Sequence, residues 1–173
     1  MTAAPGPVYE AIRRRRVTRQ MTPEPVDPHD LDLIIRAARY APNAGNRRLQ
    51  PVIAVTEART LRLLRLISPG MLPAPTAAAV ICIDEERAAG YGFRPGTPGL
   101  YVDVGTTAAT MLLAAFDIGV ACCPVTSFSR AAAARILGLG ESIRPQMIIC
   151  LGHAAAQQPP AMGAPVDDNT ERR

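Results

Sequence analysis

The chain has 173 residues, a length that suits one domain with a substantial core, and it carries a net charge of +4. Its 19 strongly basic residues are all arginines, and hydrophobic residues make up 48% of the chain but aromatic residues only 4%. No aromatic residue interrupts the main arginine run, which argues against single-stranded nucleic-acid binding. A chain with this many aliphatic residues can form a stable core without disulfides.

The first forty residues are predicted to form two helices. A helix over 7–16 has an apolar face and runs into five arginines between residues 13 and 19. Several prolines then break the chain before a second helix, predicted over 29–41. Either Asp27 or Asp30 can cap the start of this second helix.

The second helix is followed by a loop of small residues, a proline and amides, Ala41-Pro42-Asn43-Ala44-Gly45-Asn46. Asn43 and Gly45 tolerate the unusual backbone dihedrals of a loop that closely contacts a ligand. Together with the arginine run, this loop suits an anionic ligand that has a flat polar ring and a phosphate. Flavin mononucleotide (FMN) fits that description better than a sugar, a nucleic acid or a metal ion.

The middle of the chain is predicted to contain two strands, a basic helix and a loop. Residues 52–56 have a strand pattern, and a short helix over 57–67 follows. The continuous apolar run at 77–83 is typical of a strand that is buried on both faces. Glycine and proline are frequent between residues 87 and 100, which indicates a mobile surface loop over the ligand site.

The longest helix is predicted over 101–118 and is apolar nearly all round. A helix with so little polar surface lies in the centre of a fold or in a subunit interface. The remaining predicted elements are a strand at 120–125, a helix at 129–138 and a strand at 146–151. The fold class is therefore α+β, with a mixed or antiparallel sheet of about four to five strands flanked by helices. We expect one domain over 1–155 and a C-terminal extension over 156–173.

Other residue types argue against several kinds of site. His29 and His153 have no set of partners with metal-ligand spacing, so we expect no metal. The apolar runs are too short to cross a bilayer, so we expect no membrane partner. Buried thiols in a cytoplasmic protein are indicated by four cysteines that lie in apolar runs without CxxC spacing: Cys82, Cys122, Cys123 and Cys150.

Several short motifs occur in a characteristic order over residues 8–155. They are Arg15-Arg16-Val17-Thr18-Arg19, Pro25-Val26, Leu31 with Ile34-Ile35 and Ala37-Ala38, Ala41 to Asn46, Gln50-Pro51, Asp103 with Gly105, Leu112 to Ala115, Gly119, Arg135 with Gly138, Arg144-Pro145 and Leu151-Gly152-His153. In this order they resemble the nitroreductase family of FMN-dependent oxidoreductases. Each motif is weak alone, and the ordered set carries the resemblance.

The resemblance implies an intertwined homodimer with one FMN in each of two interface grooves. Arg15, Arg16 and Arg19, with Val17 between them, would hold the phosphate and ribityl oxygens of the flavin. Backbone N–H groups of Thr126 and Ser127 would reach the N5 and O4 edge of the ring. The ring would also be approached from the partner subunit by Pro42, Asn43, Ala44 and Asn46. Since the flavin carries the chemistry, no catalytic side chain is predicted, and NADPH or NADH is the expected electron donor.

The chain departs from the family pattern at several positions. Val17 replaces a serine, Gln50-Pro51 lies farther from Asn46 than usual, and the family's tail arginine aligns near Gly163. The predicted function is NAD(P)H-dependent reduction of nitroaromatic, quinone or similar electrophilic acceptors. One alternative is a flavin-dependent oxidase or dehydrogenase of a biosynthetic substrate, similar to cyclodipeptide oxidases, which could need a small partner subunit. Another is a flavin-binding protein without turnover.

Overall fold

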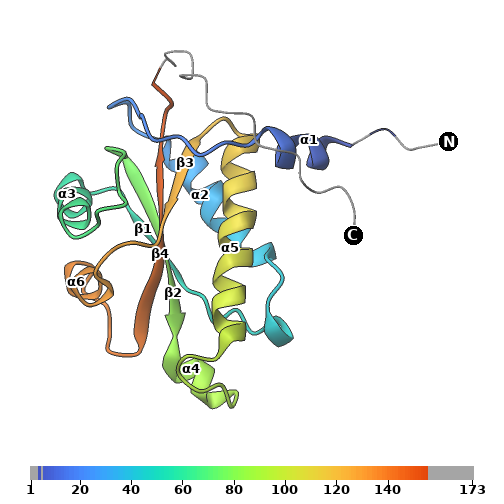
Figure 1. Ribbon diagram of the computed structural model, residues 1–173, viewed down its shortest axis with the longest axis vertical. Helices are drawn as coiled ribbons and strands as arrows, with labels where there is room; N and C mark the ends of the chain where they lie inside the picture. The colour runs from blue at the N-terminus through green and yellow to red at the C-terminus, as the bar shows by residue number, and fades with distance from the viewer. Residues whose placement is uncertain (1–3, 5, 156–173) are drawn as a thin grey trace, which may run out of the picture.

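The computed structural model describes Ala4 and residues 6–155, and its centre is a four-stranded sheet with helices on both faces (Figure 1). The strands lie in the order β1-β2-β4-β3, and every neighbouring pair is antiparallel. Their bounds are β1 (Val52–Val55), β2 (Ala77–Asp84), β3 (Ala121–Val125) and β4 (Ile143–Gly152). The α+β class and the sheet of about four strands predicted from the sequence are therefore confirmed.

Helices α3 and α6 cover one face of the sheet, and α2 and α5 cover the other (Figure 1). The described helices are α1 (Pro7–Arg14), α2 (Pro28–Ala37), α3 (Ala58–Leu66), α4 (Glu85–Gly90), α5 (Pro98–Asp117) and α6 (Arg130–Ile136), with the 3-10 turns η1 (Ala38–Tyr40) and η2 (Ala44–Asn46). Five of these helices follow the sequence pattern closely. The predicted C-terminal extension, 156–173, lies outside the described residues.

The central strand β2 contributes to both hydrophobic cores. Ala77, Ala79 and Ile81 belong to the core beneath α2 and α5, whereas Val80 and Cys82 belong to the core beneath α3 and α6. Successive side chains of a strand point to opposite faces, so a strand between two helical layers must be apolar at every position. This requirement explains the unbroken apolar run that predicted the strand.

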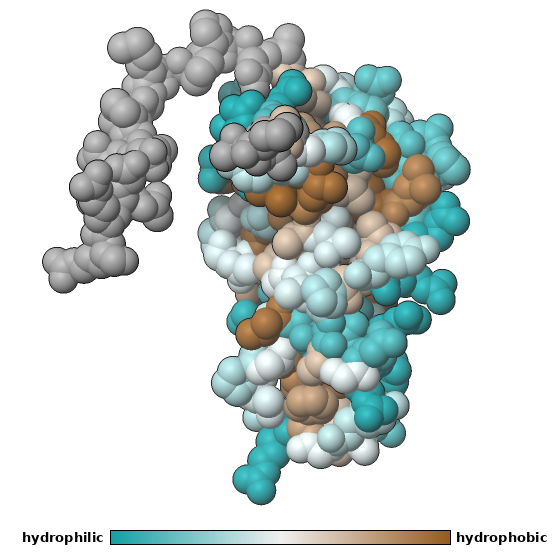
Figure 2. All heavy atoms as spheres, turned by 90° about the vertical axis from the view of Figure 1, so that its right-hand side faces the viewer, coloured by the Kyte–Doolittle hydropathy of each residue, from teal (hydrophilic) through white to brown (hydrophobic). Residues whose placement is uncertain are grey.

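Helix α5 packs one face on the sheet and leaves another face uncovered in the described chain. Val104, Met111 and Ala115 are buried, whereas Val102, which is 62% exposed, and Ala109 lie on the outer face. Figure 2 looks onto the side of the molecule formed by α1 and α5 and shows several apolar patches there, mainly in its upper part, between weakly polar and hydrophilic residues. Among the described helices, α5 alone is long and apolar enough to cross a membrane. The core helix of a soluble protein meets the same two criteria.

The segment 87–100 differs from the mobile loop that was predicted. The Asp84 side chain accepts a hydrogen bond from the N–H of Arg87 (3.0 Å) and caps α4, and α5 begins as early as Pro98. Phe93 packs against the core between these helices. The start of α4 was not predicted because its capping residue, Asp84, is also the last residue of β2, and the glycines and prolines that follow favour a loop.

Replacing Asp27 by alanine is expected to lower the free energy of unfolding by about 1 kcal/mol. Of the two candidate caps, Asp27 is the N-cap of α2, and its Oδ1 accepts the N–H of His29 at 2.7 Å. Urea denaturation would measure the change. Asp27→Asn keeps a capping oxygen and should stay near the wild type, and equal losses in both variants would contradict the capping role.

The four cysteines are free and buried, as predicted. Burial raises the pKa of Cys82 and of Cys150 to about 12. Thiolate is the reactive form of cysteine, so these side chains serve as apolar packing groups rather than as nucleophiles.

Candidate functional site

The arginine-rich segment lies along the outer edge of β3. The N–H of Thr18 donates to the carbonyl of Cys122 (3.0 Å), and Met21 forms an isolated antiparallel bridge with Ala154. Strand β3 is an edge strand, where Pro124, which has no N–H, is tolerated. The chain that follows α1 is therefore fixed against the sheet at the end where β3 begins.

The individual arginines of this segment have different partners. Arg13 forms an ion pair with Glu10 (2.8 Å), and Arg16 Nη1 donates to the carbonyls of Arg13 (2.6 Å) and Arg15 (3.0 Å). Arg15 Nη1, in contrast, is buried and has no acceptor among the described residues. A buried charged donor without a partner is unfavourable, so Arg15 is the arginine of this segment best suited to an anionic ligand.

Two cysteines of β3 show that Arg15 and Arg19 lie close to this strand. Burial raises the pKa of Cys122 to about 11, and the positive charge of Arg15 opposes this rise. Burial also raises the pKa of Cys123, against the charge of Arg19. The two outer arginines of the predicted phosphate segment thus lie at the same end of β3, with Val17 exposed between them.

The loop at 42–46 is attached to the N-terminal half of α5. The N–H of Ala44 lies 3.2 and 3.1 Å from the two carboxylate oxygens of Asp103, and Thr106 Oγ1 donates to the carbonyl of Pro42 (2.8 Å). Asp103 is only 6% exposed. Asp103 belongs to one of the motifs in the sequence, but its anchoring role was not predicted, although a carboxylate in the first half of an otherwise apolar helix was the available signal.

The loop contains two residues with left-handed backbone dihedrals, and a third lies just beyond it. Gly45, as predicted, has φ 60°, and Asn46 and Arg48 have φ 55° and 52°. Asn43, which was also expected to be unusual, is extended, with φ −149°, and its Oδ1 accepts the N–H of Arg48 (3.1 Å). A left-handed conformation costs a residue with a side chain roughly 1–2 kcal/mol, and such strain is frequent at functional sites.

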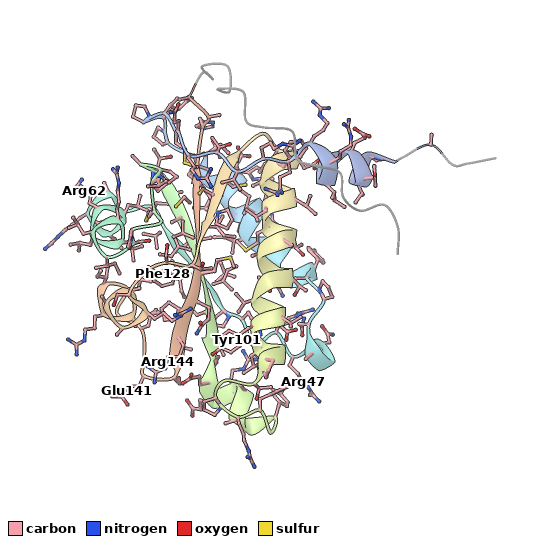
Figure 3. All side chains as sticks on the ribbon, viewed as in Figure 1. Arg47, Arg62, Tyr101, Phe128, Glu141 and Arg144 are labelled. Carbon is pink, nitrogen blue, oxygen red and sulfur yellow. The ribbon has the colours of Figure 1, made fainter. Side chains whose placement is uncertain are left out.

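Within one chain, the arginine segment and the 42–46 loop lie at opposite ends of α5. The loop contacts Asp103 and Thr106, whereas the arginines lie near β3, which follows the C-terminal end of α5 at Asp117. The helical rise separates Thr106 from Asp117 by about 16 Å. Figure 3 shows Arg47, just after the loop, beside the lower half of α5, far from α1 at its upper end. One chain therefore does not combine these two segments into a single site.

Thr126 and Ser127 lie just beyond the other end of β3. Both are exposed, and Ser68 Oγ donates to the carbonyl of Ser127 (3.1 Å). The hydrogen bonds of the described residues include none donated by the N–H of Thr126 or of Ser127. The strand rise places Thr126 about 13 Å from Cys122. The arginine segment and these two N–H groups thus lie along one edge of the sheet.

A polar groove of about 460 Å³ lies where β4 extends beyond the end of β3. Arg130 Nε donates to Gln146 Oε1 (3.0 Å), and Arg144 Nε forms an ion pair with Glu85 (3.0 Å). Tyr101 of α5 also lines this groove, and Figure 3 labels it together with Arg144. Sequence reasoning did not find this groove, because its residues come from four separate elements.

Replacing Gly70 by alanine is expected to destabilise the protein by about 1 kcal/mol and to displace Ser127. A Cβ on Gly70 would collide with Ser127 Oγ and lie 3.1 Å from Val125 Cγ1. Urea denaturation would measure the loss. The double variant Gly70→Ala/Ser127→Ala removes the colliding oxygen and should recover part of the stability, so a double variant no more stable than Gly70→Ala would contradict this explanation.

Comparison with known proteins identifies the family and the fold. The nitroreductase family model matches the chain over residues 12–96 and 74–153. A nitroreductase family protein from Streptococcus pneumoniae is 20% identical, with a TM-score of 0.75 and coverage of 95% of this chain and 98% of that one. One from Clostridium novyi is 19% identical, with a TM-score of 0.76 and coverage of 86% and 85%. An FMN-dependent nitroreductase from Clostridium difficile is 20% identical, with a TM-score of 0.73 and coverage of 86% and 88%.

Proposed function

Since the chain belongs to the nitroreductase family, we propose that it is an FMN-dependent oxidoreductase. It takes electrons from NADPH or NADH and passes them to a nitroaromatic, a quinone or a similar electrophilic acceptor. The observation that carries this proposal is the buried Arg15 Nη1, which has no acceptor among the described residues, on the same sheet edge as two free N–H groups. A protein of the same fold is named as an FMN-dependent nitroreductase, which supports the choice of flavin.

The phosphate end of the flavin fits the arginine segment. Arg15 and Arg19 would bind the phosphate, because guanidinium groups form charge-assisted, fork-shaped hydrogen bonds with phosphate oxygens. Arg16 Nη1 already donates to two backbone carbonyls, so this side chain would also hold the segment in shape. Val17 supplies no hydroxyl, and the phosphate site therefore depends on the arginines.

The ring end of the flavin fits Thr126 and Ser127. Their N–H groups would donate to the N5 and O4 edge of the ring, about 13 Å along β3 from the arginine segment. The hydrogen bond from Ser68 Oγ to the carbonyl of Ser127 helps to fix this turn. The groove beside Tyr101 and Arg130 would receive the acceptor next to the ring.

The flavin supplies the hydride chemistry when bound, and no side chain of this protein is proposed to be catalytic. The protein's residues bind, orient and shield: arginines hold the phosphate, N–H groups align the ring, and a loop covers it. That loop is Pro42, Asn43, Ala44 and Asn46 of a second copy, because the loop and the arginines of one chain lie at opposite ends of α5. We therefore propose a homodimer that packs through the uncovered face of α5, acting in the cytoplasm.

An absorbance spectrum of the purified protein with added FMN tests the proposal. We expect flavin absorbance to remain with the protein after gel filtration and to bleach anaerobically when NADPH or NADH is added. Menadione or a nitroaromatic should restore it. Protein that stays colourless after incubation with FMN would refute the proposal.

The same experiment distinguishes the two alternatives. Flavin that stays bound but is reduced by neither nicotinamide would favour a flavin-binding protein without turnover. Flavin that is reduced by a biosynthetic substrate and reoxidised by oxygen would favour the oxidase or dehydrogenase, with or without a small partner subunit.

A further inference from the structure

A second basic groove, of about 340 Å³, lies between α2, η1 and the start of β1. Its walls are partly apolar, with Ile35, Ala38 and Val52, and partly cationic, with Arg36, Arg39 and Arg48. The volume lies at the lower end of the range of small-molecule sites. This groove is separate from the arginine segment near β3, which lies beyond the other end of α5.

Two of the three arginines in this groove are available to a ligand. Arg36 forms an ion pair with Asp32 (2.9 Å), whereas Arg39 and Arg48 form no salt bridge with any described residue. The groove therefore contains two guanidinium groups without a carboxylate partner in the described part of the chain. Such an excess of positive charge favours an anionic ligand.

The backbone that carries Arg48 is held by several hydrogen bonds. Arg87 donates from Nη1 and Nη2 to the carbonyls of Arg48 (3.5 Å) and Arg47 (3.4 Å), and Asn43 Oδ1 accepts the N–H of Arg48. Arg48 is kept in a left-handed conformation that disfavours residues with side chains. Strain of this kind persists where the surrounding structure enforces it, frequently at a binding site.

An amide group with an unused donor also lines the groove. Gln50 Nε2 is buried and has no acceptor among the described residues. Buried amide donors normally have a partner, and each exception points to a role. Gln50 can therefore add a hydrogen bond to an oxygen-rich ligand once its side chain adjusts.

We propose that this groove binds a phosphate monoester with an apolar body. Arg39 and Arg48 match the geometry and charge of a phosphate, Gln50 offers a further donor, and the aliphatic wall receives the body of the ligand. The groove adjoins the 42–46 loop, since Asn43 also lines it, but none of its three arginines is among the residues proposed to bind FMN. Binding of a phosphate monoester here goes beyond the proposed oxidoreductase activity.

Isothermal titration calorimetry with phenyl phosphate tests the site. Because FMN is itself a phosphate monoester, the protein is saturated with FMN before the titration. Arg39→Gln and Arg48→Gln are each expected to weaken phenyl phosphate binding roughly tenfold or more, since each removes a charge-assisted contact. Arg62→Gln is the matched control, because it removes one positive charge from α3, on the opposite side of the sheet (Figure 3).

The ligand series decides the chemistry of the site. We expect phenyl phosphate to bind more tightly than phenol, benzoate and inorganic phosphate. Equal binding of phenol would overturn the role of the arginines, equal binding of benzoate would overturn the preference for phosphate, and equal binding of inorganic phosphate would overturn the role of the apolar wall. Thermal melting of each variant checks that it is folded.

The outcome for this site is separable from that for FMN. Arg15→Gln should leave the affinity for phenyl phosphate unchanged. Arg48→Gln should leave the contacts between the protein and the phosphate group of FMN intact. If the protein binds no FMN, the titration is made on the protein as purified and the same variants apply. An unchanged affinity in the Arg39→Gln/Arg48→Gln double variant would overturn the proposal in either case.

Discussion

Replacing Arg15 by glutamine is expected to weaken FMN binding roughly 10- to 100-fold, the loss that follows from removing one charged hydrogen-bonding partner of a phosphate. Arg15 is chosen because its Nη1 is buried without an acceptor among the described residues, whereas Arg13 and Arg16 have partners within the chain. Quenching of FMN fluorescence on titration with protein would measure the affinity.

Two matched variants make this result specific. Arg14→Gln removes the same charge from the neighbouring, exposed position and should change the affinity little. Arg15→Lys keeps the charge but loses the fork of donors, so it should fall between the wild type and Arg15→Gln. An FMN affinity that is the same for Arg14→Gln and Arg15→Gln would show that only the overall charge matters and would remove Arg15 from the site. Arg19→Ala is also expected to weaken FMN binding, by less than Arg15→Gln.

Placing an arginine at Ala109 is expected to abolish both dimerisation and tight FMN binding. Ala109 lies with Val102 and Gly105 on the exposed outer face of α5, the surface that we propose to be covered by the second copy. A charge buried in such an interface without a partner costs several kcal/mol, so we expect the dimer to weaken by roughly 100-fold or more. Analytical ultracentrifugation would measure the oligomeric state, and FMN titration would follow on the same samples.

The control for this substitution is Leu66→Arg. Leu66 lies on α3, on the far face of the sheet, and is 81% exposed, so an arginine there should leave both assembly and FMN binding unchanged. An Ala109→Arg monomer that still binds FMN as tightly as the wild type would contradict a site shared between two subunits.

The fold was largely predictable because the strands and the long helix have strong patterns. The run from Ala77 to Ile83 is typical of a strand covered on both faces, and the small polar surface of α5 favours a position in a core or an interface. The helix at 85–90 was missed because its start depends on a hydrogen bond from the N–H of Arg87 to the side chain of Asp84, which a count of glycines and prolines does not reveal.

The candidate site was predictable only in part. The arginine run and the 42–46 loop are visible in the sequence, but the partners that distinguish Arg15 from Arg16 depend on the turn after α1. Asp103 anchors the loop from a position about sixty residues away, and Arg48 reaches its groove through a left-handed backbone. Contacts of this kind require three-dimensional placement, since no local pattern encodes them.

The pairing of the arginine segment with the sheet also has a consequence for folding. Its hydrogen bonds join positions that are far apart in the chain, Thr18 with Cys122 and Thr22 with His153. Closing such long loops costs entropy that only the assembled sheet can offset, so this segment should order after the sheet and open before it. Amide hydrogen exchange should therefore be faster at Thr18 and Thr22 than in β2, and a phosphate-bearing ligand should slow it selectively. Binding of a phosphate is thus expected to stabilise the end of the molecule that contains the arginine segment more than it stabilises the central strand β2.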